Sequence, residues 1–182
     1  SRNLLGVGHF HHGSIAVRLL SFGPAEVTER AFWTQKILQA RAVRKTALHA
    51  GMSTECYRLV HGEGDGLSGL VVDIYGPVAV MQCHSIGMHR QRALIAEALR
   101  EAFGADLQAI YDKSYEALPP KYAESQQNGF LWTATDTPPE DLVVHENEVA
   151  FRVNWVTGQK TGFFLDQRDN RQLLSRFVAG KT

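Results

Sequence analysis

Residues 157–171 read TGQKTGFFLDQRDNR, and this stretch near the C-terminus organises our interpretation of the whole chain. Gly158 and Gly162 enclose the polar residues 159–161. Because glycine accepts positive φ, the pattern predicts a shaped turn. Three apolar residues follow, and Asp166 is a typical N-cap for the helix that we expect directly after it. The same pattern is also typical of a loop-to-helix junction that has no function of its own.

A second glycine-rich stretch lies upstream, where residues 57–73 read YRLVHGEGDGLSGLVVD. Its two ends are apolar and predict strands, and the loop between them contains Glu63 and Asp65. Paired acids can bind a hard cation or transfer protons, but a turn with solvated acids is the simpler interpretation. Asp73 ends the second strand, where we expect its carboxylate to bind a backbone amide or a basic group.

The hydrophobic periodicity predicts the remaining elements. Strands are expected at residues 57–60, 69–74, 78–83, 107–111 and 130–134, with a hairpin over 142–155. A long helix should begin at Pro24. A second helix, capped by Ser85, should cross over between two parallel strands. A short helix over residues 112–121 should end at Pro119 and Pro120.

Together the two glycine-rich stretches resemble one enzyme family, the PUA-containing 23S ribosomal RNA (cytosine-C5) methyltransferases of bacteria, which use S-adenosylmethionine (SAM). Residues 57–73 resemble the family signature around E-G-D-G-L. Residues 158–171 resemble the segment that precedes the family's catalytic domain. The motifs occur in the family's order and at its rough spacing, so we take the resemblance to cover nearly the whole chain.

The resemblance implies a domain organisation. Residues 1–22 would be the C-terminal remnant of a PUA-like β-barrel, 23–54 a helical linker, 55–156 a central accessory α/β domain, and 157–182 the pocket segment and helix that lead into a methyltransferase domain. We expect that Rossmann-like catalytic domain after residue 182, so the chain would be the front portion of a longer enzyme. The expected fold class is α+β, with a small mixed sheet that contains a βαβ unit.

The resemblance also gives roles to the residues around the turn. Aromatic residues would wall the SAM pocket, polar residues would hydrogen-bond the cofactor or orient the base, and a lysine would meet phosphate. The expected cofactor-binding residues are Phe163, Phe164, Asp166, Gln167 and Arg168, and the expected phosphate-binding residue is Lys160. Arg41, Arg44 and Lys45 crowd the second half of the long helix. They suit either a solvated helix end or a further RNA-binding surface.

In this family a cysteine thiolate adds to C6 of the cytosine, and the catalytic cysteines lie in the domain expected after residue 182. Cys56 and Cys83 do not occupy matching motif positions, and their spacing is typical of buried reduced thiols. We therefore assign no catalytic residue here and expect the chain alone to be inactive. His9 and His11 share a strand face without a third ligand at suitable spacing, so no metal site is predicted.

The composition is that of an ordinary globular protein, with 182 residues, 44% of them hydrophobic and 21% charged. The net charge of zero conceals an acidic centre between basic ends. Residues 1–50 contain seven Lys/Arg against two Asp/Glu, residues 51–150 six against fifteen, and residues 151–182 six against two. RNA contacts are therefore expected at the ends. The sequence has no membrane-length apolar run and no signal-peptide pattern. Two isolated reduced thiols make the cytoplasm the expected location.

As partners, the resemblance implies ribosomal RNA, and it is compatible with a homodimer. Two alternatives stay open. The chain could be a non-catalytic RNA-binding or adaptor module, which salt-sensitive RNA binding without cofactor would favour. It could also belong to a methyltransferase of the same architecture that acts on another RNA base.

Overall fold

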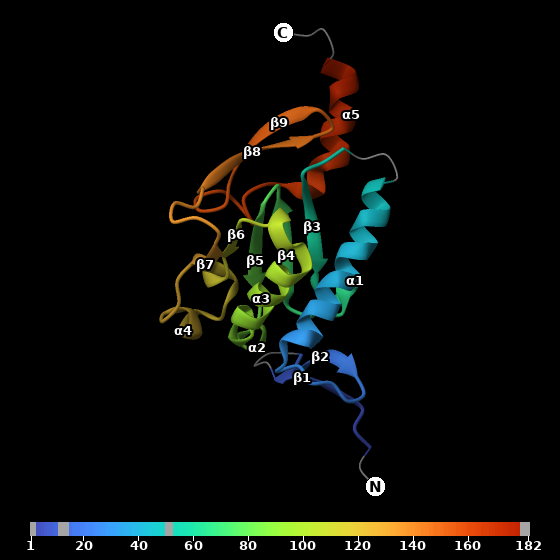
Figure 1. The fold of residues 1–182 in the computed structure, drawn as a ribbon, viewed down its shortest axis with the longest axis vertical. Coiled ribbons are helices and arrows are strands. Elements are labelled where there is room, and N and C mark those ends of the chain that lie inside the picture. Colours follow the sequence, from blue (N-terminus) through green and yellow to red (C-terminus); the bar gives the residue numbers. More distant parts are fainter. Residues whose placement is uncertain (1–2, 11–14, 50–52, 179–182) are drawn as a thin grey trace.

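The computed structural model describes residues 3–10, 15–49 and 53–178, without the side chains of residues 47–49 (Figure 1). A five-stranded sheet in the order β3-β4-β5-β6-β7 forms its centre, and two further sheets, β1-β2 and β8-β9, have two strands each. The strands are β1 (Gly6–Phe10), β2 (Val17–Phe22), β3 (Cys56–His61), β4 (Leu70–Tyr75), β5 (Val78–Cys83), β6 (Ala109–Asp112), β7 (Gly129–Thr133), β8 (Asp141–Glu146) and β9 (Val149–Asn154). The helices are α1 (Arg30–His49), α2 (Ile86–Arg90), α3 (Arg92–Phe103), α4 (Pro120–Ala123) and α5 (Arg168–Val178).

The central sheet combines a meander with a crossover. β3, β4 and β5 pair antiparallel, and the turn between β4 and β5 passes through Gly76 at φ 53°. β5 and β6 then pair in parallel, with α3 as the crossover helix, and β7 closes the sheet antiparallel to β6. Ser85 accepts a hydrogen bond from the backbone N–H of Met88 (3.2 Å) and so caps α2. The predicted α+β class, with a mixed sheet that contains a βαβ unit, is thereby confirmed.

Helices α1 and α3 cover one face of this sheet (Figure 1). Alternate residues of β4, namely Leu70, Val72 and Ile74, point toward the helices because side chains alternate along a strand. From α1, Trp33 and Ile37 are fully buried one helical turn apart. The packing joins α1 to the core of the central sheet, although the predicted boundary between residues 54 and 55 stays a prediction.

The opposite face of the sheet is covered by the hairpin β8-β9. Tyr75 and Val80 of the sheet pack with Val144, Val153 and Trp155. The hairpin lies at one end of the molecule together with α5, and β1-β2 lies at the other end (Figure 1). The second face is therefore partly apolar, under the hairpin, and partly polar, where residues 157–171 meet the sheet.

Three sequence expectations were wrong in detail. The long helix begins at Arg30 and not at Pro24, because residues 24–29 form a turn in which Val27 accepts a hydrogen bond from the Trp33 indole (2.9 Å). Pro120 starts a helix instead of ending one, since proline lacks only an N–H that is unpaired at a first helical position. We expected His9 at a solvated strand end, but it is half-buried and its Nε2 lies 2.7 Å from the Ser85 hydroxyl. His11 and His12 lie outside the described residues.

None of the helices described is both long and apolar enough to cross a membrane. Within the same part of the chain, no group of three or more His, Cys, Asp and Glu side chains could hold a metal ion.

Neighbouring residues of α1 provide a matched test of the core. Ile37 has no exposed surface, whereas 47% of Leu38 is exposed. Ile37→Ala should lower the free energy of unfolding by about 2–4 kcal/mol, because it leaves a cavity between α1 and α3. Leu38→Ala should cost less than about 1 kcal/mol. Urea unfolding of both variants measures this, and equal losses would contradict the packing described.

Candidate functional site

Residues 157–162 form a tight turn directly after β9. The Asn154 side chain accepts hydrogen bonds from the backbone N–H (2.7 Å) and the hydroxyl (3.0 Å) of Thr157. A Cβ atom at Gly158 would overlap the carbonyl oxygen of Asn154, so this position requires glycine. Lys160 has a φ of 54°, which is uncommon for a residue with a side chain. The predicted shaped turn is therefore present, and its backbone is strained at a residue that is not glycine.

The turn is anchored to the sheet through Thr161, which is completely buried. Its Oγ1 donates to Oδ2 of Asp73 (2.5 Å) and lies 2.7 Å from the Tyr75 hydroxyl. A threonine hydroxyl has one hydrogen, so Tyr75 donates the second bond. Burial, and next the Asp73 carboxylate, raise the pKa of Tyr75 far above its usual value, which keeps the phenol protonated as this donor.

Asp73 is also completely buried, and Arg58 on the neighbouring strand β3 supplies its counter-charge. Nε and Nη2 of Arg58 bind the two carboxylate oxygens at 2.8 and 3.0 Å, in the forked geometry that suits a guanidinium. The hydrogen bond to Asp73 raises the pKa of Arg58. We expected Asp73 to bind a backbone amide or a basic group, and its partners are a basic group and a hydroxyl.

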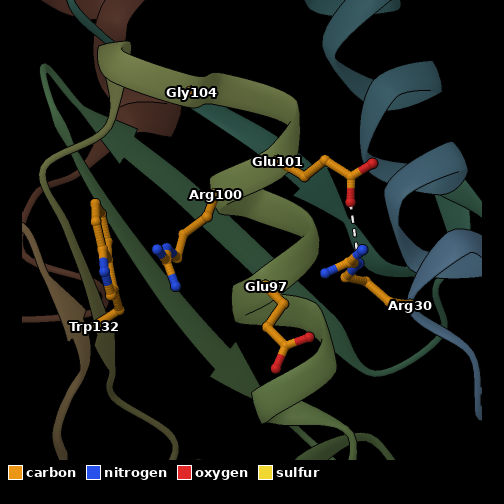
Figure 2. A pocket seen from close by; sticks show the side chains of 6 residues that line it. All are labelled: Arg30, Glu97, Arg100, Glu101, Gly104 and Trp132. Carbon is orange, nitrogen blue, oxygen red and sulfur yellow. Dashed lines mark ion pairs between the residues drawn. The ribbon is translucent and has the colours of Figure 1, made fainter.

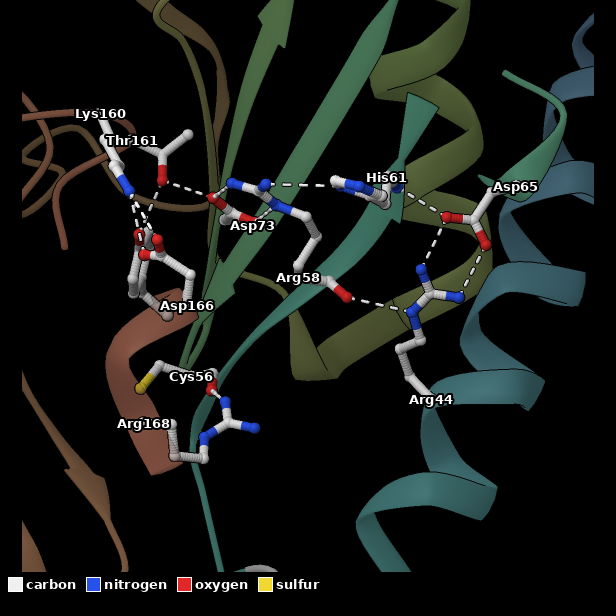
Figure 3. A network of polar contacts seen from close by, with 11 residues as sticks. Arg44, Cys56, Arg58, His61, Asp65, Asp73, Lys160, Thr161, Asp166 and Arg168 are labelled. Atoms are coloured by element: carbon white, nitrogen blue, oxygen red, sulfur yellow. Dashed lines mark hydrogen bonds and ion pairs between the residues drawn. The ribbon is translucent and has the colours of Figure 1, made fainter. Parts of the chain in front are cut away.

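The polar contacts continue from Arg58 to the acidic loop (Figure 3). The carbonyl oxygen of Arg58 accepts from Nε of Arg44 on α1 (3.1 Å), and Arg44 binds both carboxylate oxygens of Asp65 at 2.7 and 2.6 Å. Asp65 also accepts from the backbone N–H of His61 (2.6 Å). One run of contacts thus connects the two glycine-rich stretches, and Asp65 in it is an ion-pair partner.

A second anchor holds the end of the segment. The buried carboxylate of Glu146 on β8 binds Arg168 at 3.3 Å and Arg171 at 2.8 and 2.9 Å. Arg168 also donates to the carbonyl oxygen of Cys56 (2.7 Å), and Arg171 donates to that of Phe164 (2.8 Å). The first turn of α5 is therefore fastened to the hairpin and to β3 by two arginines.

The outer side of the segment presents a small mixed surface. Nζ of Lys160 lies 2.9 and 3.0 Å from the carboxylate oxygens of Asp166 and 4.6 Å from the ring centre of Phe164. The hydrogen bond from Lys160 lowers the pKa of Asp166. Asp166 is part of a 3-10 turn, Leu165–Gln167, that precedes α5, so its predicted role as the N-cap was wrong. Phe164, Asp166 and Gln167 are exposed beside one another.

The expected cofactor-binding residues therefore divide into two groups. Phe164, Asp166 and Gln167 face solvent. Phe163 packs against Phe151 of the hairpin, with ring centres 5.0 Å apart, and Arg168 binds Glu146. Sequence reasoning missed Thr161 and Glu146 altogether. The available signal was an acidic residue among the apolar residues of a strand, namely Asp73 for Thr161 and Glu146 itself. A buried acidic side chain requires a hydrogen-bonding or charged partner.

The expected RNA-binding arginines of α1 have partners within the chain. Arg41 binds Asp106 (3.0 Å) and stacks on Phe103 at 4.2 Å, and Arg44 binds Asp65. Lys45 is exposed on the same helix. Their contact with RNA stays a prediction.

A separate hollow of about 660 Å³ lies where α1, α3 and β7 meet (Figure 2). Its six lining residues are Arg30, Glu97, Arg100, Glu101, Gly104 and Trp132. Arg100 stacks on the Trp132 indole at 4.6 Å, and Arg30 pairs with Glu101 at 3.2 Å. None of these six residues was expected to be functional, and their charges largely compensate one another.

Comparison with known proteins finds relatives in several bacteria. No protein-family model matches the chain. It is 36% identical over 168 residues to the "Ribosomal RNA large subunit methyltransferase I" of Aliivibrio fischeri (strain ATCC 700601 / ES114), covering 92% of this chain and 41% of that protein. For the protein of this name from Shewanella amazonensis, 36% identity extends over 179 residues, 98% of this chain and 44% of the relative. The chain thus spans about two fifths of the length of these relatives.

Solved structures give the same fold. A protein from Streptococcus mutans described as a SAM-dependent methyltransferase superposes with a TM-score of 0.75 and 23% identity, over 93% of this chain and 42% of that chain. A second structure, described as a methyltransferase complexed with SAH, gives a TM-score of 0.74, also at 23% identity. At this identity the likeness concerns the fold alone.

Two carboxylates of β8 provide a matched test of the second anchor. Glu146→Gln removes the buried charge between Arg168 and Arg171 and should lower the free energy of unfolding by about 2 kcal/mol or more. Asp141→Asn breaks the pair with Arg152, whose side chain is 75% exposed, and should change it by less than about 0.5 kcal/mol. Chemical unfolding compares the two, and a Glu146 variant as stable as the Asp141 variant would contradict the anchor.

The exposed pair Lys160 and Asp166 can be tested by titration. In Lys160→Met the carboxylate loses its hydrogen-bonding cation, so the pKa of Asp166 should rise toward its ordinary value. Lys160→Arg keeps a cation and should keep the pKa low. Carbon-detected NMR of the Asp166 carboxyl measures both, and an unchanged pKa in the methionine variant would rule out the pairing.

Proposed function

We propose that this chain belongs to the ribosomal RNA large subunit methyltransferase I family and forms the front part of a SAM-dependent enzyme that methylates ribosomal RNA. The observation that carries the proposal is the 36% identity over 92–98% of the chain to proteins of that name. An identity of this size over nearly every element includes both glycine-rich stretches. A reaction on ribosomal RNA in turn places the enzyme in the cytoplasm.

The finer substrate assignment is C5 of a cytosine in 23S ribosomal RNA, and the two motif resemblances support it. Such chemistry needs a thiolate nucleophile. Cys56 and Cys83 are both completely buried, and burial raises the pKa of each thiol. Neither is suited to attack a base, so the nucleophile is assigned to the rest of the longer enzyme, and this chain contributes binding and positioning.

SAM supplies the methyl group of the reaction, and the outer surface of the segment has the groups to hold it. Phe164 offers an exposed aromatic face, which suits a purine ring or a sulfonium. The Asp166 carboxylate can accept hydrogen bonds from ribose hydroxyls, and Gln167 can accept or donate. Phe163 and Arg168 act from the inside, since they hold this surface against the hairpin and β3.

RNA contacts are assigned to the cations Lys160, Arg41, Arg44 and Lys45. Lys45 and Lys160 have exposed side chains and are better placed to meet phosphate than Arg41 and Arg44, whose side chains are mostly buried. The proposed organisation of the enzyme keeps the expected segments, with residues 1–22 at the end of a PUA-like barrel and residues 157–182 leading into the catalytic domain. A homodimer is part of the same proposal.

A domain exchange tests the proposed function. Replacing the matching 168 residues of the Aliivibrio fischeri relative by this chain should give an enzyme that transfers labelled methyl from SAM to large-subunit ribosomal RNA. The 182-residue chain alone should transfer none. The intact relative and the relative with these residues deleted are the controls.

The outcomes separate the alternatives. An inactive exchange protein that folds and binds RNA without SAM would favour the adaptor function. Methyl transfer to a base other than cytosine C5, read from the digested RNA, would retain the enzyme and overturn the substrate assignment.

A further inference from the structure

The turn at residues 158–162 is stabilised more by side chains of distant residues than by hydrogen bonds within its own backbone. Its own backbone contributes two hydrogen bonds, from Gly158 N–H to Asn154 and from Gly162 N–H to Gln159. Lys160 has its unfavourable positive φ between them. A strained backbone persists only where the surroundings determine it more strongly than its own preferences do.

The side chains that fix this turn come from β4 and from the end of β6. Asp73 and Tyr75 of β4 hold the buried Thr161 hydroxyl. Lys113, just past the end of β6 and 95% buried, donates from its ammonium to the carbonyl oxygen of Gly158. Burial lowers the pKa of Lys113, so an ammonium at this place carries a desolvation cost. The turn is thus fixed at both of its ends by side chains that are far away in sequence.

We infer that Asp73 is a positioning residue, which acts through Thr161 to set the surface of Lys160, Phe164 and Asp166; this inference rests on the proposed function, which makes that surface part of the SAM site. Because Asp73 is completely buried, its effect on the surface has to pass through another side chain. It fixes Thr161, and Thr161 is adjacent to Lys160, whose ammonium lies against both Phe164 and Asp166.

Arg58 is a positioning residue of the same network, one step further back. Without its guanidinium the Asp73 carboxylate would be a buried unpaired charge, which would take up a proton or rotate away from Thr161. The run of contacts goes on through the Arg58 carbonyl to Arg44 and Asp65, so the acidic loop supports Arg58 in turn (Figure 3). A ligand that binds to a preorganised surface loses less free energy to the ordering of side chains. A hydrogen-bond network of this kind provides such preorganisation.

Hydrogen exchange on the full 182-residue chain tests the local claim. Thr161→Val removes the hydroxyl and keeps the shape, and amides of residues 158–168 should then exchange about tenfold faster or more, as expected for losing a hydrogen bond to a charged group. Thr161→Ser restores the hydroxyl and should restore slow exchange. Thr157→Val, at the exposed end of the same turn, should change it less than about threefold.

Two results would overturn the inference. One is unchanged exchange of residues 158–168 in Thr161→Val. The other is a uniform increase through the whole chain, which would show that Thr161 contributes only to global stability.

The functional claim is tested in the exchange protein with the Aliivibrio fischeri relative. Thr161→Val and Asp73→Asn should each raise KM for SAM about tenfold with kcat changed less than about threefold, and Thr161→Ser should restore KM. An unchanged KM would reject the positioning role even if local exchange rises. If the unsubstituted exchange protein transfers no methyl, the proposed function fails, and hydrogen exchange still decides whether Asp73 and Thr161 fix the turn.

Discussion

Asp73 places a carboxylate on a strand whose neighbouring residues are apolar, and none of it reaches solvent. A charge in such a place is tolerated only when it is paired and its oxygens are hydrogen-bonded. Arg58 satisfies the first condition and Thr161 contributes to the second. Because one partner comes from β3 and the other from the turn after β9, this carboxylate joins the start of the C-terminal segment to the sheet.

The two faces of the sheet differ in their contacts, since one is covered by apolar packing and the other combines apolar packing with buried ion pairs. On the side of α1 and α3 the core is apolar and holds the sheet together. On the other side the hairpin β8-β9 covers only part of the sheet, and the buried acids Asp73 and Glu146 bind basic groups from the surroundings. The segment is therefore fastened at Gly158 by Lys113, at Thr161 by Asp73, and at Arg168 and Arg171 by Glu146. The surface of Phe164 and Asp166 lies between the last two of these attachments.

Much of the fold could be predicted because its signals are local. Hydrophobic periodicity predicted the strands of the sheet and the hairpin, and Ser85 marked the start of the helical crossover. The predicted helix boundaries were wrong at Pro24 and Pro120. Proline is compatible both with a turn and with the first position of a helix. Local preference alone does not choose between them.

The site was predictable only as a stretch of sequence. Periodicity and motifs placed residues 157–171 correctly after a hairpin, but they do not tell which side of a turn faces inward. Phe163 and Phe164 are neighbours of the same type, and one is packed while the other is exposed. The partners of Thr161 and Glu146 were missed for the same reason, because pairing between distant polar side chains is decided by tertiary packing.

The sequence distance across the first anchor also orders the folding of the chain. Thr161 is 88 residues from Asp73 and 86 from Tyr75, whereas β3, β4 and β5 are joined by short connections. Closing a long loop costs entropy before its contact is gained, so non-local contacts tend to form late. We therefore expect the pair of Asp73 with Arg58, which lies within the meander, to form before the contact of Asp73 with Thr161.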